Sequence, residues 1–235
     1  EFILQSTINS EKNRITTKLL NVEDGRNFWS KTIRESDVEG EGDFIDEATG
    51  LIAALIAGHD GAIHRDILAK ALVKKEEDLT PMELLQLGKA IWENPVEDVT
   101  VDGTRYLENC IKLNPDISTA HAILSEVYLE DIRQDYNRTP DAMTKAKAAV
   151  KRAIELNPSN AIALIEQIWI SWHEKDFTQC KLQIEAAMKA NPYEPLVLVS
   201  AGSFLASTGE DLEMGKEYLD RALRYNETPQ GWYYY

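Results

Sequence analysis

Hydrophobic and polar positions follow two different periods along the chain, and the change comes near residue 43. In residues 2–33, three short segments alternate polar with hydrophobic or β-branched positions, and polar turns separate them. The second turn contains Asp24-Gly25, which favours a tight hairpin because glycine accepts a positive φ. The region therefore predicts a three-stranded antiparallel β-meander, one face of which must be covered by another element.

From residue 43 onward, the hydrophobic residues recur at helical spacing. Helices are expected at about 43–58 and 62–74, with Asp43 as the N-cap of the first. The residues that would share one face of the first helix are Phe44, Ala48, Leu51, Ile52 and Leu55. This helix is the natural cover for the meander. From Pro81 to the end of the chain, the pattern predicts helix after helix and no strand.

A short motif that ends in asparagine recurs after helical segments, three times as Asn-Pro. Its asparagines are separated by 43, 34 and 35 residues and stand at Asn114, Asn157, Asn191 and Asn226. A period of 34 residues is the length of the tetratricopeptide repeat. The first interval is nine residues longer, and the polar stretch 130–141 offers a place for the excess.

Small residues also recur at the positions where the two helices of such a repeat cross closely. These residues are Gly103, Cys110, Ala146, Ala153, Cys180, Ala187, Gly215 and Ala222. Both cysteines of the chain belong to this set, which predicts buried structural thiols rather than reactive ones. Because they fall in non-adjacent repeats, no disulfide is expected between them.

On these motifs, residues 80–235 resemble a tetratricopeptide-repeat protein. The expected repeats are 80–115, 118–158, 160–192 and 194–227, followed by the start of a further helix at 229–235. The resemblance implies a mainly α fold, an α-α superhelix of helix hairpins. The three-stranded antiparallel β-meander and its helix would precede this superhelix at the N-terminus.

The first strands carry a second resemblance, to the end of the TolB-type amino-terminal-like α/β domain. The matching positions are Leu4-Gln5-Ser6-Thr7, Arg14, Leu19-Leu20-Asn21, Asp24-Gly25 and Phe28-Trp29, followed by the helical stretch DFIDEATGLIAALI. Thr7 departs from the family pattern, and the first half of that domain is absent from the sequence. Residues 1–78 are therefore expected to be a partial α/β domain, and the chain to be a fragment of a longer protein.

In bacteria, this domain followed by tetratricopeptide repeats resembles the sensory or regulatory part of larger signalling proteins. Such proteins carry a class III adenylate cyclase domain or, as in ToxR-like regulators, a winged-helix DNA-binding domain. The resemblance implies a non-catalytic region that binds a protein or a ligand, within a transcriptional regulator or an adenylate cyclase. It leaves open whether the region lies in the bacterial cytoplasm or on the periplasmic side of the inner membrane.

The net charge of −15 narrows the set of expected partners. Nucleic acids and anionic membranes are bound by clustered lysine and arginine, and the most basic stretch, 145–152, is short and typical of a solvated helix face. The longest strongly apolar run, Leu51–Ala57, is far shorter than the roughly 20 residues of a membrane span. Neither nucleic-acid binding nor membrane insertion is expected of these residues.

Candidate chemistry is sparse. His59 and His64 are five residues apart, but no cysteine or carboxylate pattern completes a zinc site, so histidines at the surface or at a helix cap are expected. The sequence contains neither a glycine-rich phosphate loop nor a nucleophile motif. We therefore expect no catalytic residue, no metal site and no cofactor. The alternative is a hydrolase, or another enzyme, that uses the abundant acidic residues.

A partner-binding groove is the more specific hypothesis, because stacked helix pairs line a concave surface with the first helix of each repeat. The groove positions in this register are Lys89, Trp92, Glu126, Leu129, Trp169, Trp172, His173 and Ser203. The partner would be a protein, a peptide or another domain of the same protein, and a homodimer stays open. The alternative is that the tryptophans are core residues, because they also form a hydrophobic stripe with Ile165 and Ile168.

Overall fold

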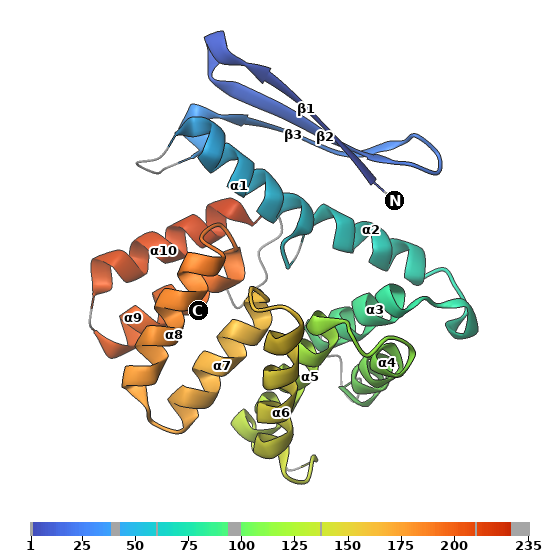
Figure 1. Cartoon of the computed structure of the whole chain (residues 1–235), viewed down its shortest axis with the longest axis vertical. Helices are drawn as coiled ribbons and strands as arrows, with labels where there is room; N and C mark the ends of the chain where they lie inside the picture. Colours follow the sequence, from blue (N-terminus) through green and yellow to red (C-terminus); the bar gives the residue numbers. More distant parts are fainter. Residues whose placement is uncertain are drawn as a thin grey trace.

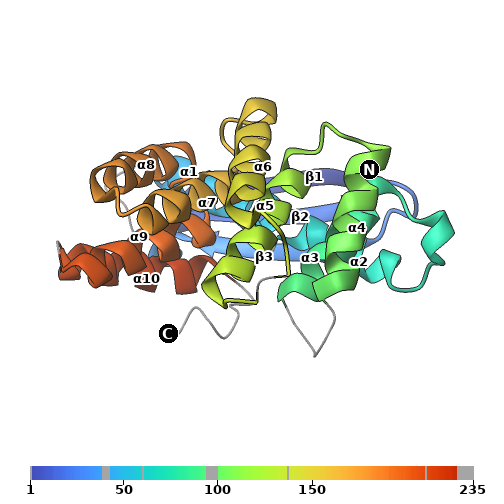
Figure 2. The same cartoon turned by 90° about the horizontal axis from the view of Figure 1, so that it is seen from below.

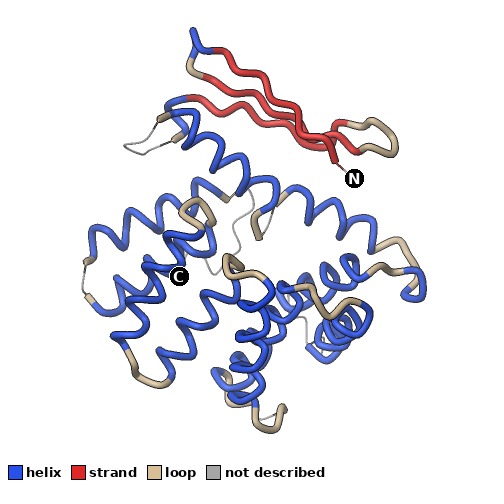
Figure 3. The backbone as a smooth tube through the Cα atoms, viewed as in Figure 1, coloured by secondary structure: helices blue, strands red, loops and turns tan. Residues whose placement is uncertain are grey.

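The computed structural model describes residues 2–38, 43–59, 61–93, 100–136, 138–209 and 211–226. Three layers lie one above another in Figure 1: a sheet, the helices α1 (Phe44–Ala57) and α2 (Ala62–Ala71), and an arc of further helices. Figure 3 shows the same order, with the strands (red) on one side of the helices. The chain is thus mainly helical with a small N-terminal sheet, which confirms the predicted fold class.

The sheet contains β1 (Phe2–Asn9), β2 (Arg14–Asn21) and β3 (Asn27–Arg34), antiparallel and in the order β1-β2-β3. Its second turn forms as predicted, because Gly25 adopts a φ of 68° and donates its N–H to the carbonyl oxygen of Asn21 at 2.9 Å. One face buries Ile15, Leu19 and Ile33 in a cluster with α1. The predicted meander is therefore confirmed.

Helix α1 is hydrophobic on two sides, as its sequence FIDEATGLIAALIA requires. It packs against the sheet on one side and against α9 (Pro195–Thr208) and α10 (Leu212–Tyr225) on the other. Asp43 caps it as predicted, because its carboxylate accepts the backbone N–H of Ile45 at 2.8 Å. The side away from the sheet is closely packed, because a Cβ added to Gly50 would stand 2.2 Å from the ring of Tyr193, just before α9. Helix α1 is therefore a central layer and not only a cover for the sheet.

The arc is built of helix hairpins whose two helices contact each other. They are α3 (Pro81–Glu93) with α4 (Thr100–Leu113), α5 (Ser118–Arg133) with α6 (Ala142–Leu156), α7 (Ala161–His173) with α8 (Phe177–Ala190), and α9 with α10. In Figure 2 they follow one another from α3–α4 at one end to α9–α10 at the other. The further helix expected at 229–235 lies outside the described residues. Within the described ranges, no helix combines the length and the apolar character that crossing a membrane requires.

The recurring asparagines mark the end of the second helix of each hairpin. Asn157 and Asn191 are the C-caps of α6 and α8, and Asn114 directly follows α4. The side-chain oxygens of Asn114 and Asn157 accept the backbone N–H groups two residues further on, at 3.2 and 3.0 Å. This local bond offers the backbone an alternative to the helix, and the proline that follows cannot continue it. The motif therefore recurs because it ends helices.

Small residues let the two helices of a hairpin approach closely. A Cβ added to Gly202 of α9 would lie 2.8 Å from the carbonyl oxygen of Gly215 in α10, and one added to Gly88 of α3 would lie 2.8 Å from the side chain of Leu107 in α4. Both cysteines stand at such positions and are buried free thiols. Burial raises the pKa of Cys110 to about 11, so this thiol stays protonated and unreactive.

Five of the nine extra residues of the first repeat interval lie in the connection between α5 and α6, which spans 134–141, whereas the connection between α7 and α8 spans 174–176. The other four lengthen the helices, because α5 is three residues longer than α7 and α6 is one residue longer than α8. Asp131, near the end of α5, holds this connection against the helix. Its carboxylate oxygens accept the backbone N–H groups of Arg138 and Thr139 at 3.0 and 2.7 Å. Most of the excess is therefore accommodated in this connection, and α5 and α6 keep their pairing.

Helices α1 and α2 connect the two ends of the arc. Helix α2 packs against α3 of the first hairpin, and α1 packs against α10 of the last (Figure 1). Leu196, at the start of α9, contacts three hydrophobic clusters, centred on α1, on α3 to α5, and on α7 to α9. The N-terminal helices therefore hold both ends of the repeat array, and the hydrophobic core runs through all the helical layers.

Candidate partner-binding site

Trp172, in the last turn of α7, is half-buried among aromatic side chains. Its ring meets Phe177 at the start of α8 and Phe204 of α9 edge-on, with ring centroids 5.3 and 5.6 Å apart. Aromatic rings attract each other in this arrangement because a positive edge meets a negative face. Trp172 therefore takes part in the packing of α7, α8 and α9.

Trp169, one turn earlier on α7, is more open to solvent. Its relative exposure is 38%, although its ring also meets that of Trp172 edge-on at 6.3 Å between centroids. The guanidinium of Arg133, at the end of α5, lies 5.7 Å from the centre of the indole, which is close enough for a cation–π interaction. Trp169 therefore lies at the surface between α5 and α7, with part of its apolar area free to contact a partner.

A buried carboxyl group, that of Glu166, lies on α7 one turn before Trp169. Glu166 is 3% exposed, and its Oε2 has no hydrogen-bond partner among the described residues. Burial raises the pKa of Glu166 well above its ordinary value, Glu126 on α5 raises it further, and Arg133 acts in the opposite sense. The fold therefore favours the protonated form of this carboxyl group.

Arg133 is fixed by its own helix. Its Nε lies 2.6 Å from Oε2 of Glu130, three residues earlier on α5. We call the surface built from these side chains the tryptophan face; its members are Glu126, Glu130, Arg133, Glu166, Trp169 and Trp172. It combines an exposed indole with acidic groups and one cation that is already paired.

The structure distributes the predicted groove residues over several environments. Glu126, Trp169 and Trp172 lie in the tryptophan face. His173 is exposed at the end of α7, and Ser203 is exposed on α9. The groove role of these residues stays a prediction.

Three further groove positions lie in other surroundings. Leu129 is buried in a cluster with Ala146, Val150 and Ile170. Lys89 is buried, and its Nζ donates a hydrogen bond to the carbonyl oxygen of His59. Trp92 belongs to the last turn of α3, and its side chain lies outside the described residues.

Sequence reasoning missed Glu130, Arg133 and Glu166. A signal for the first two exists, because Glu126, Glu130 and Arg133 follow spacings of four and three residues and so share one face of α5. For Glu166 the sequence offers no signal. Its burial depends on α5 lying against α7, which involves residues far away along the chain.

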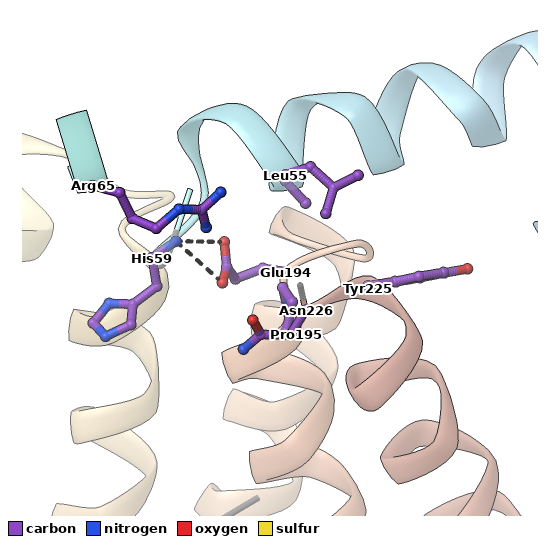
Figure 4. A pocket seen from close by; sticks show the side chains of 8 residues that line it. Leu55, His59, Arg65, Glu194, Pro195, Tyr225 and Asn226 are labelled. Atoms are coloured by element: carbon purple, nitrogen blue, oxygen red, sulfur yellow. Dashed lines mark hydrogen bonds between the residues drawn. The ribbon is translucent and has the colours of Figure 1, made fainter. Parts of the chain in front are cut away.

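A second region, which we call the junction, joins the turn between α1 and α2 to the start of α9 and the end of α10 (Figure 4). The Glu194 carboxylate, before α9, accepts the backbone N–H of His59 at 3.3 and 3.4 Å. The cavity beside it measures about 10 Å³ and is lined by Ala54, Leu55, His59, Arg65, Glu194, Pro195, Tyr225 and Asn226. This space holds about one water molecule, so the junction is a structural contact rather than a ligand site.

The two neighbouring histidines belong to this junction. His64 Nδ1 lies 3.1 Å from the carbonyl oxygen of His59, and both residues are half-buried. Burial lowers the pKa of His64 below its ordinary value. In the part of the chain that the structure describes, no three side chains of histidine, cysteine, aspartate or glutamate form a group that could hold a metal ion.

Comparisons with known proteins bear on the fold. No protein-family model and no curated protein matches the chain. Among solved structures, TTC0263, a tetratricopeptide-repeat protein of Thermus thermophilus, is similar over 69% of this chain and 79% of its own, with 14% sequence identity and a TM-score of 0.51. Two other solved structures superpose less closely. MamA has 20% sequence identity and a TM-score of 0.42 over 71% of this chain and 87% of its own. Yeast Tom70 has 18% sequence identity and a TM-score of 0.46 over 72% of this chain and 31% of its own. The likeness to TTC0263 confirms the predicted fold, a superhelix of tetratricopeptide-type hairpins.

Proposed function

We propose that this chain is a non-catalytic protein-binding region whose tryptophan face recognises a protein or peptide partner. The observation that carries the proposal is Trp169, a large indole that is 38% exposed between two neighbouring helices. Tryptophan and arginine are the residue types most enriched among those that dominate binding energies. The first helices of stacked hairpins also form one extended surface, which suits an elongated partner.

The charges near the indole define the chemistry of the partner. Glu126 and Glu130 lie on one face of α5, and Arg133 is already paired with Glu130. The chain as a whole carries a net charge of −15. A matching partner offers an apolar side chain to the indole and a cationic side chain to the carboxyl groups, because opposite charges steer association and reject acidic competitors.

A more specific proposal is that this region is the regulatory or sensory part of a larger bacterial signalling protein. Its support is the resemblance of residues 2–33 to the end of a TolB-type amino-terminal-like domain, next to tetratricopeptide repeats. The parent protein would be a transcriptional regulator or an adenylate cyclase. The coding sequence next to this segment tests the idea directly. A cyclase or winged-helix domain in the same reading frame supports it, and a gene that encodes these 235 residues alone contradicts it.

The alternative function, a hydrolase that uses acidic residues, finds less support. Such an enzyme needs a carboxyl group with a raised pKa in a pocket that substrate can enter. Glu166 has the raised pKa, but it is 3% exposed between two packed helices. The same residue is better explained as part of a helix contact that shapes the tryptophan face.

The experiment compares proteins captured from a lysate of the source organism by three forms of this chain: wild type, Trp169→Ala and Leu182→Ala. Leu182 is a matched control, because it is an exposed apolar residue of α8, at 57% exposure. We expect one or more proteins to be retained by wild type and Leu182→Ala and lost from Trp169→Ala. If a folded Trp169→Ala variant retains every protein that wild type retains, the proposal is wrong.

A further inference from the structure

The guanidinium of Arg133 is placed between two acidic environments. Its Nε lies 2.6 Å from Oε2 of Glu130, and its centre lies 5.7 Å from the centre of the Trp169 indole. It also acts on the buried carboxyl group of Glu166, whose Oε2 has no hydrogen-bond partner among the described residues. The more exposed carboxylate therefore holds the cation, and the buried carboxyl group does not.

The charges that act on Glu166 come from α5. Helix α7 packs against α5, α6, α8 and α9. Burial favours the neutral form of Glu166, Glu126 and Glu130 on α5 favour it as well, and Arg133 opposes them. Helix α9 contains no charged side chain, and the charged side chains of α6 and α8 are exposed to solvent, as is His173 at the end of α7. Arg133 is therefore the counter-charge on which the ionisation of Glu166 depends.

The two carboxyl groups compete for Arg133 on unequal terms. Arg133 and Glu130 are both partly open to solvent, and such an ion pair contributes little to stability. Glu166 is 3% exposed, and an ionised carboxylate at such a site is costly unless a counter-charge lies beside it. Protonated, Glu166 needs no cation. Ionised, it attracts Arg133 more strongly than Glu130 does.

We propose that Glu166 and Arg133 form a proton-controlled switch that opens and closes the tryptophan face, an inference that rests on the function proposed above. While Glu166 is protonated, Arg133 stays on Glu130 and covers the indole of Trp169. When Glu166 releases its proton to solvent, the guanidinium turns toward the new carboxylate. The indole and the carboxylate of Glu130 are then both open, and these are the groups that a partner with an apolar and a cationic side chain would contact.

The switch makes partner binding depend on pH. Burial raises the pKa of Glu166 well above its ordinary value of 4.5, so the closed state persists at a pH where exposed carboxyl groups are already ionised. The open state gains population as the pH rises through the folded-state pKa, and the affinity for a partner rises with it. By linkage, a partner that binds the open state releases a proton from Glu166.

The first test needs no partner, because it observes the indole itself. The chain is labelled with fluorotryptophan, and the Trp169 fluorine signal is identified as the one missing from Trp169→Phe. Its shift between light and heavy water measures water access from about pH 4 to pH 9, the range that covers a raised carboxyl pKa. In wild type we expect water access to rise with pH, with a midpoint above 4.5. Glu166→Gln should keep the low value throughout, and Arg133→Gln the high one.

Two results of this measurement would overturn the switch. One is a Trp169 signal whose water access is the same at every pH in wild type, and the other is a pH response that persists in Glu166→Gln. The matched control is His173→Gln, because His173 is the other ionisable side chain of α7 and lies one turn beyond Trp169. This variant should respond as wild type does, and a response lost with His173 also contradicts the proposal.

The second test examines the competition for Arg133. Glu130→Gln weakens the hold of this residue on Arg133 and removes a negative charge near Glu166, so the midpoint should move to lower pH. The control is Glu155→Gln, which removes an exposed carboxylate from α6 and should leave the midpoint unchanged. A midpoint that is the same in Glu130→Gln and wild type contradicts the exchange of Arg133 between the two carboxyl groups.

Partner binding supplies the last test and separates a failure of the switch from a failure of the proposed function. A partner retained in the capture experiment should bind wild type at least about tenfold more tightly above the fluorine midpoint than below it, and Glu166→Gln equally at both. Equal wild-type affinities contradict the switch and leave the binding function standing. If Trp169→Ala captures every protein that wild type captures, the binding function is wrong, and the fluorine measurement decides the switch by itself.

Discussion

Tyr225 and Trp169 are both large aromatic residues at contacts between helices, and the molecule packs them differently. At the junction, Tyr225 is 2% exposed and lies in a buried cluster with Leu198 and several residues of α1. On the tryptophan face, Trp169 is 38% exposed, with the guanidinium of Arg133 over its ring. Tyr225 is buried because α1 covers it, whereas Trp169 stays partly open to solvent because no described element covers it fully.

This difference in packing predicts different effects of substitution on stability and on partner binding. At the junction, a lost side chain leaves a cavity among elements that come from both ends of the chain. At the tryptophan face, a lost indole removes a surface and leaves most of the packing in place. We therefore expect substitutions at the junction to lower stability, and substitutions at the tryptophan face to weaken partner binding with little loss of stability. Trp172, which is half-buried, should show an intermediate loss of stability.

The largest loss of stability is expected for Leu198→Ala at the junction. Leu198 is fully buried in the cluster that joins α1 to α9 and α10, so its truncation should lower the free energy of unfolding by about 2–5 kcal/mol. The matched control is Leu212→Ala at the start of α10, where a 62% exposed leucine should change it by less than about 0.5 kcal/mol. Urea unfolding followed by circular dichroism measures both, and equal effects would contradict the role given to the junction.

A smaller loss is expected for Trp172→Ala. The substitution removes the edge-on contacts with Phe177 and Phe204 from a half-buried site, so it should cost about 2 kcal/mol. Trp172→Phe should keep most of this stability, because a ring remains between the helices. A cost below about 0.5 kcal/mol for the alanine variant would show that Trp172 belongs to the open surface instead.

Glu166→Gln should change the dependence of stability on pH. The folded-state pKa of Glu166 is raised, so its contribution is fully present below the ordinary carboxyl pKa of about 4.5 and is lost as pH rises through the folded value. Glutamine mimics the protonated carboxyl group at every pH. We therefore expect the variant to be more stable than wild type at pH 8 and equal to it near pH 4. Thermal unfolding across this range measures the difference, and parallel pH profiles would argue against a buried protonated carboxyl group.

The smallest effect on stability is expected for Trp169→Ala. The residue is partly exposed, and it would lose the contact with Arg133 and the edge-on contact with Trp172, together worth about 1 kcal/mol. Urea unfolding of Trp169→Ala beside Trp172→Ala gives the comparison. A loss for Trp169→Ala as large as that for Trp172→Ala would mean that both tryptophans are core residues.

Local signals in the sequence were enough for the meander, the helix hairpins and the helix ends. Asp24-Gly25, Asp43 and the recurring Asn-Pro motif act through hydrogen bonds and backbone angles within a few residues, so their effect does not depend on the rest of the fold. The small residues at helix crossings, such as Gly103 and Gly215, follow from the period of the repeat.

Contacts between distant segments could not be predicted in the same way. Lys89 is assigned to a groove by its repeat position, but in the structure it donates to the carbonyl oxygen of His59, thirty residues earlier. The burial of Glu166 likewise depends on how α5 lies against α7. The position of a residue in the repeat predicts which side of its hairpin it faces. It does not predict that α1 and α2 pack against the ends of the array.

The central claim is that the tryptophan face binds a partner while the junction holds the fold. The most direct measurement is the affinity, by titration calorimetry, of a captured partner for wild type, Trp169→Ala and Leu182→Ala, with the unfolding midpoint taken on the same preparations. The account predicts an affinity at least about tenfold weaker for Trp169→Ala, with a nearly wild-type midpoint, and no change for Leu182→Ala. Wild-type affinity in a folded Trp169→Ala variant would contradict it.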